Sequence, residues 1–356
     1  MKNMKKAMAL LLCLILATGL LAGCGGGDSE GGEPAGELNL FTWDGMFPQE
    51  VLDEFEAETG IRIYYSNFDT DEAMLAKLEE TQGGDYDLVI ADDYIIELAI
   101  AEGLVQKLDK SKITTYDNLN PLYMGQFYDP ADEYTIPWGA GIPLIVYNPA
   151  LTGFDLTSYA DLWNPALEDN LALIGNYRVL NGITLKTMGE SMNVDDVAKI
   201  EAAGEKLKAL APNVRVISDS NTQDFLISEE VAAAFMYTSQ VNLAMTSRDD
   251  LKICYPSEGL GFGIMAAFVP SQAPNSDAAH QFLDYLNQPE VAAKCFEYLG
   301  YYCTNKAAEE HISEAMYDLL VVPESVTEGE IIQNISQEGE DAHAKVWNEF
   351  KAACGQ

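Results

Sequence analysis

The sequence predicts an α/β fold made of two lobes, and three observations support this prediction. Strand-like apolar runs alternate with amphipathic helical stretches over residues 38–91, in the order βαβαβ. A similar series follows residue 143, and the stretch 134–147 has the Pro and Gly content of a strand that leaves one lobe and starts another. About 320 residues follow the N-terminal segment, which is enough for two hydrophobic cores.

In the first lobe, residues 38–41 read as a strand and a helix is expected to begin near Pro48. Its apolar face would consist of Val51, Leu52 and Phe55, and Gly60 would end it. The alternating residues 61–65 predict a second strand parallel to the first.

The next helix is predicted to begin with a capping box formed by Asp69 and Glu72, because an acidic residue three positions after a capping residue is typical of helix starts. Residues 86–91 are almost continuously apolar, as in strands buried on both faces of a parallel sheet.

In the second lobe, the pattern predicts strands at 171–174 and 231–236, with helices around 194–210. The glycine-rich residues 259–263 are interpreted as a turn that enters a strand at 264–269. Helices are expected at 277–286 and 291–298.

The N-terminus predicts export from the cytoplasm. Three lysines precede an apolar run too short to span a membrane and stop there, so residues 1–23 are predicted to be a signal peptide. The sequence Leu21-Ala22-Gly23-Cys24 resembles the lipobox of bacterial lipoproteins, in which such a cysteine carries the lipid. Residues 24–37 are then a flexible tether, and the protein is expected to be membrane-anchored on the outer side.

The net charge and the cysteine spacing limit the kinds of molecule that the protein is expected to bind. The formal net charge is −37, which excludes nucleic acid and anionic lipid surfaces as expected partners. The acidity alone is equally consistent with a purely solubilising role. The spacing of Cys254, Cys295, Cys303 and Cys354 fits no zinc motif, so neither a metal nor another cofactor is predicted. Their pairing remains open.

Aromatic and acidic residues follow the predicted strands, where ligands bind in open α/β sheets. Aromatic faces beside carboxylates suit an alkylammonium ligand. The alternative is that each aromatic only caps the core with its polar tip in water. The residues at these strand ends are Trp43, Asp44, Asp92, Asp93, Tyr94, Asn176, Tyr177, Arg178 and Tyr237.

Five stretches resemble the spermidine/putrescine-binding proteins of ABC importers, and the similarity covers essentially all of the chain after the tether. They are residues 40–66, 86–113 (YDLVIADDYIIELAIAEGLVQKLDKSKI), 134–149 (YTIPWGAGIPLIVYNP), 157–165 (TSYADLWNP) and 299–308 (LGYYCTNKAA).

The resemblance implies a type II periplasmic-binding-protein fold, in which two lobes with mostly parallel sheets flanked by helices close over a solute. The lobes are expected to comprise 38–142 with 266–311, and 143–265 with 312–356. The implied function is an extracytoplasmic receptor that captures a polyamine and delivers it to a membrane ABC permease, as a monomer.

The resemblance also implies binding residues, position by position. Trp43, Tyr94 and Tyr301 match family aromatics, and Tyr237 stands in place of a Trp. Most acids differ: Gly45, Asn176, Val179 and Met265 replace carboxylates, and Met46 replaces a Tyr. Asp44 and Asp92 stand where the family has Thr and Ser, so negative charge has moved. The expected set is Trp43, Asp44, Met46, Asp92, Tyr94, Asn176, Tyr177, Arg178, Tyr237, Met265 and Tyr301.

The ligand has a rival interpretation. The rival solute is an amino-acid-like zwitterion or another amine. An inward-facing Arg178 would repel a diamine and suit a carboxylate or phosphate, whereas an outward or salt-bridged Arg178 would leave the polyamine interpretation unchanged.

An enzyme is not expected. His280, His311 and His343 belong to no HExxH or GxSxG motif and are interpreted as surface residues. A sensor or adhesin that uses the same closing motion remains an alternative to transport.

Overall fold

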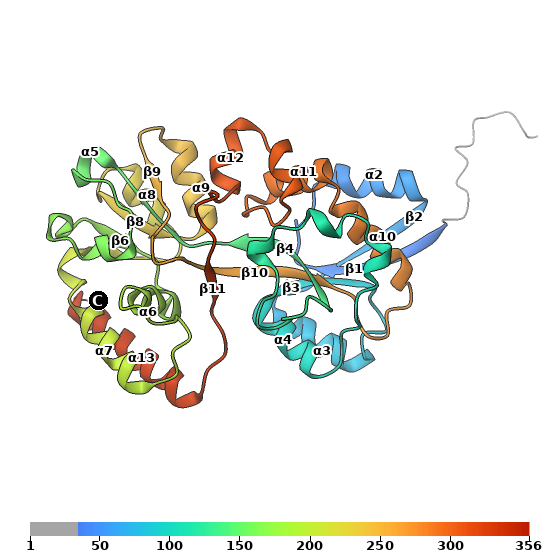
Figure 1. Ribbon diagram of the computed structural model, residues 1–356, viewed down its shortest axis with the longest axis horizontal. Coiled ribbons are helices and arrows are strands. Elements are labelled where there is room, and N and C mark those ends of the chain that lie inside the picture. The colour runs from blue at the N-terminus through green and yellow to red at the C-terminus, as the bar shows by residue number, and fades with distance from the viewer. Residues whose placement is uncertain (1–34, 356) are drawn as a thin grey trace, which may run out of the picture. The chain divides into compact units, whose positions relative to one another are not determined.

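The computed structural model describes residues 35–355, which form two β-sheets covered by helices (Figure 1). The predicted signal peptide, Cys24 and nearly all of the tether lie outside the described residues. We call the part that carries the first sheet the first lobe, and the part that carries the second sheet the second lobe.

The first sheet has the strand order β11-β10-β3-β1-β2, with β4 paired to β10. β1 is parallel to both β2 and β3, as the βαβαβ order predicts. The strands are β1 (Gly36–Thr42), β2 (Ile61–Asn67), β3 (Leu88–Asp92), β4 (Thr135–Gly141), β10 (Leu260–Phe268) and β11 (Gly329–Ile331). The helices of this lobe are α2 (Gln49–Thr59), α3 (Asp71–Thr81), α4 (Asp93–Ala101), α10 (Ser276–Leu286), α11 (Pro289–Leu299) and α12 (Glu314–Leu320).

The second sheet has the order β7-β6-β8-β5-β9. Its strands are β5 (Leu144–Tyr147), β6 (Leu171–Leu173), β7 (Val214–Ile217), β8 (Ala233–Met236) and β9 (Lys252–Cys254). Its helices are α5 (Pro149–Thr152), α6 (Tyr177–Lys186), α7 (Val197–Lys208), α8 (Thr222–Ile227), α9 (Thr238–Ser247) and the C-terminal α13 (Gln337–Ala353), which packs against α6 and α7. Short 3-10 turns complete the connections.

Alternating side chains of the strands pack into separate cores on the two faces of the first sheet. Leu40 of β1 packs with Phe55 of α2 on one face, and Phe41 packs with residues of α3 and α4 on the other. In Figure 1, α2, α10 and α11 lie on one side of this sheet, and α3 and α4 lie on the other.

Both sheets also contain antiparallel pairs beside the predicted parallel ones. β10 is antiparallel to β3 and β4, and β5 is antiparallel to β8 and β9. The antiparallel strands β4, β5, β9 and β10 are those through which the chain changes lobes. β4 and β9 lead out of their lobes, and β5 and β10 enter from the other lobe rather than from a crossover helix, so parallel pairing is not imposed on these strands.

The chain passes between the sheets three times. Residues 142–143 join β4 to β5, residues 255–259 join β9 to β10, and a segment after β11 leads to α13. The first crossing was predicted from residues 134–147. The predicted lobe boundary at 265/266 falls inside β10, and the exact division of the chain into lobes stays a prediction.

Two local predictions were wrong. Thr70 caps α3 by accepting a hydrogen bond from the Ala73 N–H (3.2 Å), while the Glu72 carboxylate instead accepts from the Tyr94 hydroxyl. The residues 260–263 belong to strand β10, and of this glycine run only Gly259 adopts a left-handed turn conformation (φ 85°). Leu260 and Phe262 are buried there, and this burial extends the strand.

Candidate functional site

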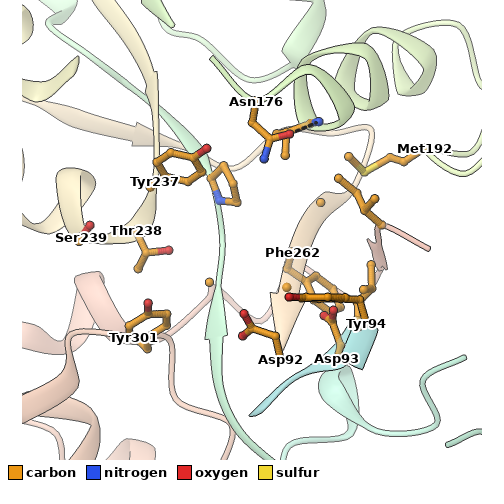
Figure 2. A pocket seen from close by; sticks show the side chains of 17 residues that line it. Asp92, Asp93, Tyr94, Asn176, Met192, Tyr237, Thr238, Ser239, Phe262 and Tyr301 are labelled. Atoms are coloured by element: carbon orange, nitrogen blue, oxygen red, sulfur yellow. Dashed lines mark hydrogen bonds between the residues drawn. The ribbon is translucent and has the colours of Figure 1, made fainter. Parts of the chain in front are cut away.

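A cavity of about 470 Å³ lies between the two sheets. The first lobe contributes the ends of β3 and β4, the start of α4, the glycine-rich part of β10 and the residues around β11. The second lobe contributes the first residues of α6 and α9. Five residues of the expected binding set line it, Asp92, Tyr94, Asn176, Tyr237 and Tyr301, and so does the strand-end residue Asp93 (Figure 2).

The first-lobe wall is acidic. Asp92 ends β3, Asp93 begins α4, and both line the cavity. Asp71, at the start of α3, stands behind them and accepts hydrogen bonds from the Asp92 N–H (3.4 Å) and the Tyr94 hydroxyl (3.2 Å). No Lys, Arg or His side chain among the described residues forms an ion pair with Asp71, Glu72, Asp92 or Asp93.

These carboxyl groups are held in an environment that disfavours their charge. Burial, together with the neighbouring Asp71 and Asp93, raises the pKa of Asp92 to about 8. Burial raises the pKa of Asp93 to about 6, although its carboxylate accepts a hydrogen bond from the Ile264 N–H (2.8 Å). Burial also raises the pKa of Asp71. Of these three carboxyl groups, only Asp92 has no backbone N–H donor among the described residues; it shares a side-chain hydrogen bond with Asp71 instead. Its charge is therefore the one most in need of an external cation.

Three tyrosine rings surround the cavity. Tyr94 lies beside the carboxylates, whereas Tyr237 and Tyr301 lie on the other side of Asp92 in Figure 2. Burial raises the pKa of each hydroxyl, so the rings stay neutral and offer their π faces to a cation.

The second-lobe wall is uncharged. Asn176 caps α6, because its side-chain oxygen accepts the Val179 N–H (3.1 Å). Thr238 binds both the N–H and the carbonyl of Ile142 and so joins α9 to the crossing segment. Val179, Met192 and Ser239 complete this wall.

Three predicted residues after β1 do not line the cavity. The Trp43 ring packs against Phe68, with centroids 4.9 Å apart, Asp44 is exposed to solvent, and Met46 is buried in the core. The Tyr65 hydroxyl donates to the Trp43 carbonyl (2.5 Å) and accepts from the Met46 N–H (3.2 Å), which fixes this loop. The predicted contacts of Trp43, Asp44 and Met46 with a solute stay predictions.

Tyr177, Arg178 and Met265 also lie outside the cavity lining. Arg178 is buried and paired with Glu340 of α13, and the Tyr177 hydroxyl donates to the same carboxylate (2.9 Å). Of the two orientations considered for Arg178, the structure has the salt-bridged one, so this guanidinium is not available to a solute carboxylate. Met265, in β10, is buried beside Gly139 of β4.

Several lining residues were missed by sequence reasoning, among them Phe262, Ile331 and Ile332. Phe262 lies in the stretch interpreted as a turn, and β11 is a three-residue strand with no period of its own. Asp71, behind the acidic wall, looks in the sequence like an ordinary acidic residue of a first helical turn.

The histidines and cysteines serve the fold. His280 and His343 are buried, contrary to the surface interpretation, whereas His311 is exposed, as that interpretation expects. His280 accepts the Asp109 N–H (2.9 Å) and bonds the Ser276 carbonyl. Cys254, Cys295, Cys303 and Cys354 are free thiols. Within residues 35–355, no cluster of His, Cys, Asp and Glu side chains is arranged to hold a metal ion, and no helix is both long and apolar enough to cross a membrane.

Comparisons with known proteins agree with this architecture. A family model described as bacterial extracellular solute-binding protein matches residues 50–318. The spermidine/putrescine-binding periplasmic protein of Salmonella typhimurium is 33% identical over 293 residues, covering 82% of this chain and 84% of the relative. The spermidine/putrescine-binding periplasmic protein 1 of Haemophilus influenzae is also 33% identical, with 77% and 78% covered.

A solved structure shares the fold closely. The spermidine/putrescine ABC transporter substrate-binding protein PotD from Streptococcus pneumoniae superposes with a TM-score of 0.81 at 27% identity, covering 90% of this chain and 100% of that one.

Proposed function

This chain belongs to the family of bacterial extracellular solute-binding proteins, and from that premise we propose that it captures an alkylammonium solute of the polyamine class between its two lobes. It would then present the solute to a membrane permease of an ABC importer. The observation that carries this proposal is the unpaired carboxylate of Asp92 in a tyrosine-lined cavity at the lobe junction.

The chemistry of the cavity supports an amine over an anionic solute. An ammonium group placed beside Asp92 would supply the counter-charge that the wall lacks, in a charge-assisted hydrogen bond. The ring faces would add cation–π attraction, on the order of 0.5 to 2 kcal/mol each. Within residues 35–355, no Lys or Arg lines the cavity, and Arg178 is already paired.

Catalysis is not part of this proposal. Among the described residues, the cavity lining holds no His, Cys or Lys side chain that could act as a nucleophile or a strong base.

Isothermal titration calorimetry with putrescine and spermidine tests the proposal. Asp92→Asn should weaken binding about 10- to 100-fold, because a hydrogen bond to a charged group contributes about 1.5 to 3 kcal/mol. Asp85→Asn is the matched control, since it removes the same charge from an exposed site of the same lobe. Absence of heat with every amine would refute the proposal, as would equal losses in the two variants.

We further propose that Cys24 carries a lipid anchor, that residues 24–37 are the tether, and that the anchored receptor acts as a monomer. The lipobox-like sequence before Cys24 supports this. Labelling of cells with radioactive palmitate should mark the wild-type protein and leave Cys24→Ala unlabelled. An unlabelled wild-type protein would rule the anchor out.

A further inference from the structure

We propose that the solute carries one ammonium group at one end and a hydrogen-bond-accepting oxygen, of a hydroxyl, carbonyl or carboxylate, at the other. This inference rests on the proposed function, because it assumes that an alkylammonium solute occupies the cavity. It departs from the polyamine class in one respect, since an oxygen takes the place of the second amino group.

The charge of the cavity is one-sided. Both carboxylates that line it, Asp92 and Asp93, come from the first lobe. The second-lobe carboxylate beside the cavity, Asp219, does not line it. Asp219 accepts hydrogen bonds from the Gly175 N–H (2.7 Å) and the Tyr237 hydroxyl (3.5 Å). A diamine that crosses the cavity would therefore find a carboxylate at only one of its two ends.

The opposite wall offers donors instead. A backbone N–H can bond only to the oxygen of an amide side chain, so the cap on the Val179 N–H fixes the orientation of Asn176. Its NH₂ group is thus turned toward the cavity, opposite Asp92 and Asp93 (Figure 2). This group has two hydrogens, so beside its hydrogen bond to the Tyr237 hydroxyl it can still donate to a solute. An NH₂ group donates hydrogen bonds and cannot accept one from an ammonium.

Helix polarity acts in the same direction. α6 and α9 each have ten residues, and the first residues of both contribute to the cavity lining. The start of a helix carries partial positive charge and unpaired N–H groups, which attract oxygen atoms and repel cations. The start of α4 also lines the cavity, at the acidic end, but there the carboxyl groups of Asp92 and Asp93 offset its partial positive charge, whereas no carboxylate of the described residues lines the cavity beside the starts of α6 and α9. The exposed Ser239 in the first turn of α9 adds a hydroxyl to this wall.

Between the two walls the lining is apolar, with Phe262, Ile331 and Ile332. These side chains suit the aliphatic part of a solute and offer no site for a second charge in the middle of the chain. The cavity as a whole therefore has an acidic end, an apolar centre and a donor end.

Calorimetry on the wild-type protein with three four-carbon probes tests the inference. Putrescine, 4-amino-1-butanol and 4-aminobutyrate share the ammonium and the chain length and differ only in the far group. We expect at least one of the two oxygen-bearing probes to bind as tightly as putrescine or more tightly. The probe that binds better tells whether the oxygen is neutral or anionic. Putrescine binding at least threefold more tightly than both would overturn the inference while leaving the proposed function intact. Absence of binding by all three would refute both.

A gain-of-function variant provides an independent readout. Val179→Glu places a carboxylate on the donor wall, and it should shift the ratio of putrescine affinity to 4-amino-1-butanol affinity at least tenfold toward putrescine. Val179→Gln, of the same size but uncharged, should leave that ratio within about twofold of wild type. An unchanged ratio in a folded Val179→Glu protein would show that this wall does not meet the far end of the solute, and it would overturn the inference.

Discussion

At the scale of single residues, Asp92 dominates the chemistry of the cavity. It occupies the last position of β3, where burial and two other carboxyl groups, Asp71 and Asp93, disfavour its ionised form. A side chain in this state gains more from a bound cation than an exposed, already hydrated carboxylate would. Asp92 therefore stays partly protonated in the absence of solute and becomes fully ionised only when a cation binds beside it.

This arrangement predicts a pH dependence of binding. With a pKa of about 8, Asp92 is largely protonated below neutrality, so capture of an ammonium must expel a proton. Affinity should rise by tens of fold, roughly 50-fold for a single linked proton, between pH 6 and pH 8. Calorimetry at several pH values measures this, and Asp92→Asn should flatten the profile. A pH-independent wild-type affinity would contradict the assignment.

The same pKa predicts the opposite trend for stability without solute. The folded-state pKa of Asp92 lies above its unfolded value of 3.8, so the folded state binds more protons between pH 4 and pH 8, and the stability that this proton contributes is lost as pH rises through that window. Asp92→Asn lacks this loss. In urea unfolding, the free energy of unfolding of Asp92→Asn should rise relative to that of the wild type from pH 4 to pH 8. A difference that does not change with pH would refute the raised pKa of Asp92.

Tyr237 allows the ring to be separated from its hydroxyl. Tyr237→Phe keeps the π face and should change amine affinity by no more than about twofold. Tyr237→Ala should lose about 2- to 30-fold, which corresponds to 0.5 to 2 kcal/mol of cation–π attraction. Equal losses in both variants, measured by calorimetry, would assign the role to the hydroxyl and its contact with Asp219 rather than to the ring.

At the scale of elements, helix α6 has two distinct sides. Asn176 and Val179 face the cavity, whereas Arg178 is tied to Glu340 of α13 and donates to the Gln333 carbonyl (3.2 Å). The tie holds the start of α6 against the C-terminal helix. Arg178 therefore supports the position of the cavity wall without contacting the solute.

This role predicts a loss of stability with little loss of affinity. Glu340→Gln leaves the buried Arg178 without its counter-charge and should lower the free energy of unfolding by about 1.5 to 3 kcal/mol. Glu338→Gln, in the same first turn of α13 but exposed, is the matched control. Chemical denaturation measures both. This role would be contradicted if Glu340→Gln left the free energy of unfolding unchanged, whether or not the variant also weakened amine binding tenfold.

The elements also show what sequence reasoning could reach. The α2 helix begins beside Pro48 and ends at Gly60 as predicted, because Val51, Leu52 and Phe55 form a clear apolar face and Gly60 adopts the left-handed conformation (φ 72°) that ends a helix. Strand β11 gave no such signal. It has three residues, and its place is set by pairing with β10, which lies about seventy residues earlier in the chain.

The residues of the site were likewise predictable only in part. The rule that ligands bind beyond strand ends found Asp92, Tyr94, Asn176 and Tyr237, which do meet at one cavity. It could not tell which neighbour of Asn176 turns inward. That depends on the helical rotation of about 100° per residue after the cap, which puts Val179 in the cavity and Arg178 against α13.

At the scale of the whole molecule, the cavity belongs to neither lobe alone. The carboxylates and the donor wall are on different lobes, joined by the crossing segments at 142–143 and 255–259 and by the residues after β11. A solute that touches both walls favours the arrangement in which they are close. Binding to the folded state alone must also stabilise the molecule.

This linkage predicts a thermal shift. An amine at 100 times its dissociation constant should add about 2.7 kcal/mol to the free energy of unfolding and raise the melting temperature, as differential scanning calorimetry would detect. Butanol, which lacks the ammonium, is the control and should have no comparable effect. An equal shift with butanol would show that the apolar centre, rather than the charge, drives binding.

The most direct test of the central claim is a crystal structure of the protein with a bound alkylamine. The account predicts the ammonium nitrogen within about 2.7 to 2.9 Å of an Asp92 carboxylate oxygen, with the aliphatic chain directed toward Asn176 across Phe262. An amine that lies elsewhere, or that turns its nitrogen toward Asn176 and away from Asp92, would contradict it.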